Sequence, residues 1–158
     1  MGQKSNPNGL RLGIIRQWYS QWYAEDKQVP YLIYEDFRIR SLIKKFYNRG
    51  IISHIEIKRL KKANNEEITI DLFTSKIGIV QGTEHKEQKK LLQKIEKEIN
   101  KKVIINVFEV KAIDKIASLV AQNIALQLQK RAYFRVVQKI TAQKVLKSSA
   151  IGVKIIIS

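Results

Sequence analysis

The pattern of apolar and polar residues changes its period twice within residues 68–110. Alternate positions are apolar over residues 68–72, which is typical of a strand with one buried face. A short apolar segment then ends at Gly82, and glycine suits a turn before a helix because it lacks a Cβ. Residues 86–100 have helical periodicity, and residues 103–110 are almost continuously apolar. The stretch therefore predicts a strand, a short helix, a turn, a long helix and another strand.

The long helix predicted at residues 86–100 has one apolar side and one mostly basic side. Its apolar stripe consists of Leu91, Leu92, Ile95 and Ile99. Residues 103–110 are apolar at both alternating sets of positions, which favours a strand covered by helices. Together these patterns indicate a sheet with helices packed on one face.

One more helix and one more strand are predicted earlier in the chain. Residues 35–48 are apolar at helical spacing, begin with two acids and are followed by Gly50 as a stop. Residues 51–58 alternate like a strand, and a polar connection at residues 61–67 leads to the strand at residues 68–72. We expect these two strands to pair antiparallel.

Residues 113–129 form a second helical pattern that continues toward residue 147. Its apolar positions recur every fourth residue: Ile116, Val120, Ile124 and Leu128. Residues 153–157 are apolar like a strand, yet no later strand follows to pair with them. The predicted fold class is α+β, with helices on a small sheet followed by the helical start of a second, incomplete α/β domain.

Residues 1–16 carry three basic residues and no acid, and glycine and proline interrupt them. We predict an extended basic arm that becomes ordered on a polyanionic partner. Trp18 and Trp22 lie four residues apart, so on a helical turn they would share one face. Packing that anchors the arm to the domain is favoured over stacking on bases, because clustered tryptophan is normally buried.

The charge of the chain indicates the kind of partner it binds. Its 158 residues include 30 Lys and Arg against 14 Asp and Glu, a formal net charge of +16. Such an excess predicts a polyanion, and nucleic acid is favoured over a membrane surface because the basic segments lack the bulky apolar face of an interfacial helix. No apolar run is long enough to cross a bilayer, and the polar beginning is unlike a secretory signal.

The densest basic cluster lies at residues 130–147, which contain six basic residues and no acid. Arg131, Arg135 and Lys139 are spaced by four, so one helix would align them as a ridge that meets several phosphates. The candidate phosphate-binding residues of the arm and this cluster are Lys4, Arg11, Arg16, Lys130, Arg131, Arg135, Lys139, Lys144 and Lys147.

Candidate catalytic and metal-binding residues are few. The chain has no cysteine and only two histidines, of which His54 is isolated from other candidate ligands and is expected on the surface or in packing. Glu66 and Glu67 fall in the predicted polar connection, and Glu35 and Asp36 match the acids of a helix N-terminus. We therefore expect no enzyme activity, no cofactor, no metal and no small-molecule substrate.

The chain resembles bacterial-type small-subunit ribosomal protein S three in four colinear motifs. These are Met-Gly-Gln-Lys-x-x-Pro-x-Gly-x-Arg-Leu-Gly at the N-terminus, the spaced Trp18 and Trp22, Gly78-Ile79-Val80-x-Gly82, and Gln127-Leu128-x-Lys130-Arg131-x-x-Phe134-Arg135. The resemblance implies a type II KH domain at residues 18–112. It also implies a basic arm at residues 1–17 and the start of a C-terminal domain at residues 113–158.

The resemblance further implies partners. Family members lie in the head of the small ribosomal subunit, contact 16S-type rRNA, neighbour proteins S ten and S fourteen, and help line the mRNA entrance. The rRNA contacts implied for this chain are Lys4, Arg11, Arg16, Lys130, Arg131, Lys144 and Lys147. The family's Arg-Arg-x-x-Lys at the entrance falls on Arg135, Val136 and Lys139, so its middle charge is missing. The grip on mRNA is therefore expected to be weaker, unless Arg131 and Lys130 compensate.

The KH turn departs from that of bacterial members, which carry two glycines with basic residues between them. Here Gly82 is followed by Thr83, Glu84 and His85. A carboxylate repels phosphate, and histidine does not easily take the positive φ of glycine. We predict that this degenerate KH loop does not clamp single strands in the standard way, and that Gly82→Ala has little effect on RNA contact.

A Gly-x-x-His turn is similar to that of plastid family members, and the abundance of Ile, Lys and Asn indicates an AT-rich genome. The expected location is a ribosome in a plastid, in the chloroplast stroma, with the cytoplasm of an AT-rich bacterium as the alternative. As an alternative function, the chain would be a free-standing KH-type regulatory RNA-binding protein.

Overall fold

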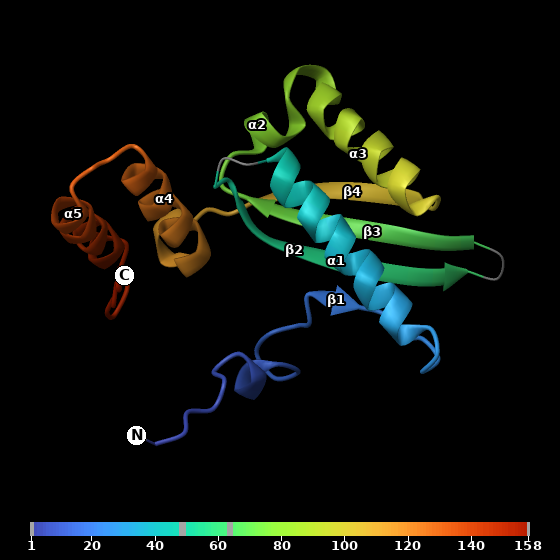
Figure 1. Cartoon of the computed structure of the whole chain (residues 1–158), viewed down its shortest axis with the longest axis horizontal. Helices are drawn as coiled ribbons and strands as arrows, with labels where there is room; N and C mark the ends of the chain where they lie inside the picture. The colour runs from blue at the N-terminus through green and yellow to red at the C-terminus, as the bar shows by residue number, and fades with distance from the viewer. Residues whose placement is uncertain (1, 48–49, 63–64, 158) are drawn as a thin grey trace.

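The computed structural model describes residues 2–47, 50–62 and 65–157, and it describes no side chain at residues 61, 62, 65 and 84. Its elements, with 3-10 helices written η, are η1 (Gly9–Arg11), β1 (Ser20–Gln21), α1 (Val29–Phe46), β2 (Ile52–Lys62), β3 (Asn65–Thr74), α2 (Ile77–Gln81), η2 (Thr83–His85), α3 (Lys86–Ile99), β4 (Lys102–Glu109), η3 (Ile113–Lys115), α4 (Ala117–Gln129) and α5 (Phe134–Lys147). Helices α1 and α3 lie on the same face of the sheet, while α4 and α5 form a helical pair at its side (Figure 1).

A mixed sheet of four strands, in the order β1-β2-β3-β4, organises residues 20–109. β2 and β3 are antiparallel, with Ile57 opposite Ile70, and β3 and β4 are parallel, with Ile70 opposite Ile105. β1 adds a short parallel pairing in which Ser20 lies opposite Ile57. The predicted antiparallel pair and the α+β class are confirmed.

The hydrophobic core lies between the sheet and the two long helices α1 and α3 (Figure 1). Ile68, Ile70 and Leu72 of β3 are fully buried, as their alternation predicts. Leu91 and Ile95 of α3 are buried as well, at 1% and 0% exposure. The apolar stripe predicted on this helix therefore faces the core.

Tyr47 closes the core just after α1. Its hydroxyl donates a hydrogen bond of 2.9 Å to the carbonyl of Val80 in α2. Burial, with a smaller contribution from Glu87, raises the pKa of Tyr47 to about 12. The phenol therefore stays protonated and holds the two helices together.

Helix α1 begins six residues before the predicted start at residue 35, since it spans Val29–Phe46. Pro30 lies in its first turn, where a missing backbone N–H leaves no bond unmade. Glu35 and Asp36, interpreted as N-terminal acids, lie inside the helix and are each 5% exposed. That interpretation was wrong because these acids pair with a buried cation rather than with a helix terminus. The last predicted residue of this helix, at position 48, lies outside the described residues.

Arg59 of β2 is the cation that binds both acids. Its Nη1 donates to Oε2 of Glu35 at 2.7 Å, and its Nε and Nη2 donate to Oδ1 of Asp36 at 3.2 and 2.5 Å. Lys101, just before β4, donates to Glu35 at 3.2 Å, and the indole of Trp22 donates to Oδ2 of Asp36 at 2.9 Å. This buried ionic network therefore joins α1 to β2, to the start of β4 and to the segment that follows β1.

The two tryptophans have different environments. Trp22 anchors the segment after β1 through its bond to Asp36, which confirms the predicted anchoring for this residue. Trp18 is 59% exposed, and neither tryptophan is helical. The prediction that the two tryptophans share one helical face was wrong, because the chain between them pairs with the sheet. The N–H of Ile57 donates to the carbonyl of Tyr19 at 2.9 Å.

The hairpin formed by β2 and β3 is longer than predicted. β2 extends over Ile52–Lys62 and β3 over Asn65–Thr74, so most of the expected polar connection at residues 61–67 belongs to the strands. Residues 63–64 lie outside the described part of the chain. The polar sequence misled the prediction because backbone hydrogen bonds extend a two-stranded ladder beyond its apolar part.

β4 is covered on one face only. Val103 and Ile105 are buried, but Ile104 and Phe108 on the opposite face are 41% and 45% exposed. The prediction that helices cover both apolar sets of this strand was therefore wrong, because α1 and α3 lie on the same side of the sheet (Figure 1). The other side of the sheet, called here the open face, carries Ile104 and Phe108.

Helices α4 and α5 are separated by a turn rather than continuous. α4 docks on the start of β2, where Ser118 Oγ donates to the carbonyl of Ser53 at 3.1 Å and Gln122 Nε2 to that of Ile52 at 3.3 Å. The strand predicted at residues 153–157 is not formed. A strand needs a neighbour to complete its hydrogen bonds, and none of the described strands lies beside this segment. Within the described residues, no helix has the length and apolarity to cross a membrane.

His54 is packed against aromatic rings on the open face. Its ring stacks on Phe73 of β3, with centroids 4.1 Å apart and planes 9° from parallel. Burial lowers the pKa of His54, Glu56 opposes this effect, and Arg16 reinforces it. The packed role expected for this histidine is confirmed.

Acidification is expected to destabilise the fold through His54. Because the pKa of His54 is lower in the folded state than the unfolded value of about 6.5, the folded state binds fewer protons. The contribution of neutral His54 to stability is complete above the unfolded pKa. It is lost as the pH falls through the unfolded pKa toward the folded pKa. Urea denaturation at about pH 7.5 and about pH 5.5 measures how much free energy of unfolding is lost on acidification. This loss should be smaller for His54→Phe than for the wild type. Equal losses would contradict this assignment.

Candidate nucleic-acid interface

All the predicted phosphate-binding cations are exposed on the structure. They are Lys4, Arg11, Arg16, Lys130, Arg131, Arg135, Lys139, Lys144 and Lys147. Exposure leaves these charges accessible to a polyanion, and the elements that carry them decide which can act together.

The N-terminal arm is folded locally rather than fully extended. After η1 the chain turns back, and the N–H of Arg16 donates to the carbonyl of Arg11 at 2.9 Å. The guanidinium of Arg16 donates to Oδ1 of Asn8 at 2.7 Å, and that of Arg11 donates to the carbonyl of Pro7 at 2.7 Å. The prediction of an extended arm was wrong over this part, because hydrogen bonds within the loop favour a turned conformation over an extended one. The loop brings two arginines close together on the surface.

Helix α5 aligns two of the three cations that were expected to form a ridge. Arg135 and Lys139 lie four residues apart, away from the buried side that contains Val137 and Thr141. Arg131 precedes this helix and has a left-handed φ of 59°. The prediction that three cations align in one ridge was wrong for Arg131, because the chain leaves α4 through this left-handed residue before α5 begins.

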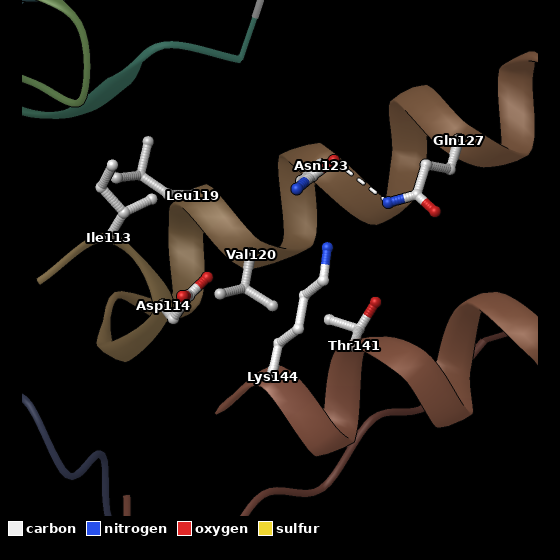
Figure 2. Close-up of a pocket in the computed structure, with 8 residues that line it drawn as sticks. All are labelled: Ile113, Asp114, Leu119, Val120, Asn123, Gln127, Thr141 and Lys144. Atoms are coloured by element: carbon white, nitrogen blue, oxygen red, sulfur yellow. Dashed lines mark hydrogen bonds between the residues drawn. The ribbon is translucent and has the colours of Figure 1, made fainter. Parts of the chain in front are cut away.

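Lys144 lies on a different side of α5 and points toward α4 (Figure 2). It lines a small cleft between the two helices together with Ile113, Asp114, Leu119, Val120, Asn123, Gln127 and Thr141. The cavity measures about 30 Å³, and within it Gln127 Nε2 donates to Oδ1 of Asn123 at 3.1 Å. That volume suits a water molecule rather than a nucleotide. Lys144 therefore does not extend the surface formed by Arg135 and Lys139.

The turn before α3 contains two residues with positive φ. Gly82 has φ 67° and ψ −177°, and His85 has φ 59° and ψ 21°. Histidine does adopt the left-handed conformation here, contrary to the expectation, and its Nδ1 lies 3.2 Å from Oε1 of Gln88. The side chain of Glu84 lies outside the described structure. The absence of a standard clamp stays a prediction.

Gly82→Ala is expected to destabilise the fold, whatever its effect on RNA contact. A Cβ at this position would lie 2.8 Å from Cγ and 3.2 Å from Cβ of Glu87, and the backbone conformation of Gly82 is essentially restricted to glycine. We expect a loss of about 1–3 kcal/mol in the free energy of unfolding, measured by urea denaturation. Gly78→Ala is the matched control, since its Cβ would meet nothing within 4 Å. Equal stabilities of the two variants would contradict the prediction.

The sequence prediction did not include a row of stacked rings on the open face. His54 of β2, Phe73 of β3 and Phe108 of β4 occupy neighbouring strands, and the rings of Phe73 and Phe108 have centroids 5.3 Å apart. The signal for this row was the second apolar set in residues 103–110. It was interpreted as burial under a helix.

Fold and charge together define a class of protein. The chain is a small α+β protein with a formal net charge of +16 and exposed cations on its N-terminal arm and on α5. Among the described residues, no group of three or more His, Cys, Asp or Glu is arranged to hold a metal ion. These properties are those of basic nucleic-acid-binding proteins.

Proteins named small ribosomal subunit protein uS3 align with the whole chain. Those of Phytoplasma vitis and Alder yellows phytoplasma are 66% identical to it over 158 residues, and that of Onion yellows phytoplasma (strain OY-M) is 53% identical. The chain spans about 63% of the length of these curated relatives. No protein-family model matches the chain.

These relatives bear on two further predictions. Their name is that of a ribosomal protein, which supports the prediction that the chain is not an enzyme. They come from phytoplasmas, which are bacteria, so the plastid location is not supported and the bacterial alternative agrees with them. The plastid prediction depended on the Gly-x-x-His turn, and a four-residue turn carries too little information to distinguish plastid from bacterial sequences.

Proposed function

We propose that the chain is a structural, non-catalytic part of the small ribosomal subunit that binds 16S-type rRNA in the subunit head. The observation that carries this proposal is the 66% identity to uS3 proteins along the entire chain. The charge of +16 supports it, because a polyanionic partner offsets the self-repulsion of so basic a protein. Phosphate contacts of this kind position a protein on RNA rather than read its sequence.

The core is proposed to be a type II KH domain at residues 18–112. The order helix, strand, strand, helix, helix, strand from α1 to β4, on a mixed sheet, supports this assignment. Residues 113–158 would then begin a second domain. A groove of about 650 Å³ between α4 and residues 152–157 supports this division, because its lining includes Ile124, Leu128 and Val153, and such apolar surface is normally covered.

The proposed contacts follow from the resemblance, and the exposure of these cations supports them. Those assigned to rRNA are Lys4, Arg11, Arg16, Lys130, Arg131, Lys144 and Lys147. Arg135 and Lys139 are assigned to the mRNA entrance, and Val136 between them is 51% exposed where the family pattern has a charge. Proteins S ten and S fourteen are the proposed neighbours in the subunit head.

Sedimentation of a cell extract tests the ribosomal assignment. The chain, detected with an antibody, should move with the small-subunit peak in a sucrose gradient and remain there after a wash at moderate salt. A free regulatory RNA-binding protein would stay near the top of the gradient. Recovery of the chain at the top alone would refute the proposal.

A further inference from the structure

The open face of the sheet carries a row of rings that ends at the edge strand. His54, Phe73 and Phe108 stand on three adjacent strands, and the interplanar angles are 9° between the first pair and 24° between the second. Tyr19 lies at the other end of the row, with its centroid 5.6 Å from that of His54. The ring of Phe73 is therefore covered on both sides by its neighbours.

Both ends of this row are accessible, since Tyr19 is 44% exposed, and Phe108 is the end that lies on the edge strand β4. β4 is the last strand of the sheet, and Phe108 is 45% exposed. Among the described residues, Phe73 is the ring that stacks on it. A planar aromatic ligand would therefore extend the row by stacking on the outer side of Phe108.

Polar residues beside the row indicate what kind of ligand fits. Asp71 is 5% exposed on the same face, and it accepts hydrogen bonds from Lys58 Nζ at 2.7 Å and from Asn106 Nδ2 at 2.9 Å. Charged groups are depleted at the centres of protein interfaces, so this face is unlike a protein-docking core. Asn106 is exposed on the same face two residues before Phe108, and Asp71 holds its amide in place, so a base that stacks on Phe108 could bond its edge to Asn106.

We infer that the open face binds one unpaired RNA base, which stacks on Phe108 beside the polar pair formed by Asp71 and Asn106. This inference rests on the proposed RNA-binding function and adds to it a base contact separate from the cations of the arm and of α5. Because stacking neutralises no phosphate, the contact contributes affinity without contributing to the salt dependence of binding.

The test uses the full 158-residue chain and a short single-stranded RNA that contains one fluorescent purine analogue. Phe108→Leu keeps an apolar side chain and removes the ring, so we expect affinity to fall about 5- to 100-fold with an unchanged salt slope, and quenching of the analogue to be lost. Ile104→Ala is the matched control on the same face, since Ile104 is 41% exposed and has no ring. It should change affinity by less than about twofold. Thermal unfolding verifies that both variants fold.

The outcomes separate this inference from the proposed function. RNA binding that is unaffected by Phe108→Leu, or reduced equally by Ile104→Ala, would overturn the base contact and leave the ribosomal role intact. Failure of the wild-type chain to bind any RNA would overturn both. A loss caused by Phe108→Leu together with a reduced salt slope would mean that phosphate contacts were disturbed, and it would also overturn the base contact.

Discussion

Replacing Arg59 by methionine is expected to lower the free energy of unfolding by about 3–5 kcal/mol. Arg59, Glu35 and Asp36 have side chains that are 8%, 7% and 7% exposed, so removal of the cation leaves two buried carboxylates without their main partner. Methionine keeps much of the volume of the arginine stem, which limits any cavity contribution. Urea denaturation of the two proteins measures the difference.

Two further variants give this prediction its controls. Arg38→Met removes a surface pair with Glu98, whose side chains are 46% and 33% exposed, and should cost less than about 1 kcal/mol. Asp36→Asn added to Arg59→Met should restore part of the lost stability, because it removes one buried charge. A loss from Arg59→Met no larger than that from Arg38→Met would show that the buried ionic network adds little.

RNA affinity of the chain is expected to fall on the order of a thousandfold between about 50 mM and about 200 mM salt, if about six phosphates are contacted. All nine cations assigned to RNA are exposed, and their counterions are released on binding. Fluorescence anisotropy with a short single-stranded RNA over a salt series measures the slope. A nearly constant affinity would contradict the assignment of these cations to phosphate.

A matched pair of double variants localises the contacts. Arg135→Gln with Lys139→Gln should reduce the steepness of the logarithmic salt slope by about 1.4–1.8, because two phosphate contacts are lost. Lys44→Gln with Lys45→Gln removes the same charge from exposed positions of α1, to which no contact is assigned, so each double variant lowers the net charge from +16 to +14. Equal slopes for the two variants would mean that overall charge, rather than the surface formed on α5, governs binding.

Local periodicity predicted the parts of the fold in which one stretch of chain buries one face. The alternation at Ile68, Ile70 and Leu72 and the stripe of α3 were both confirmed as core. The antiparallel pairing of β2 and β3 was also predicted, because the two strands are adjacent in sequence and a short connection leaves few other arrangements.

The errors occurred where a residue's partner is distant in sequence or where the chain interrupts a regular helix. Glu35 and Asp36 matched a helix start, and only the fold shows that Arg59, more than 20 residues away, binds them. The cations of residues 130–147 were expected to form one ridge, but a left-handed residue at Arg131 separates it from Arg135. Periodicity assumes a continuous helix, so it does not detect such a break.

The sequence by itself determined the basic character of the chain and the motifs that resemble those of ribosomal proteins, because these depend on composition and on short segments. Only the tertiary structure decided that the sheet has one open face, since coverage depends on where α1 and α3 pack rather than on the sequence of β4. The same arrangement placed His54, Phe73 and Phe108 on neighbouring strands in one row. Strand pairing alone brings together rings that are up to 54 positions apart in the chain.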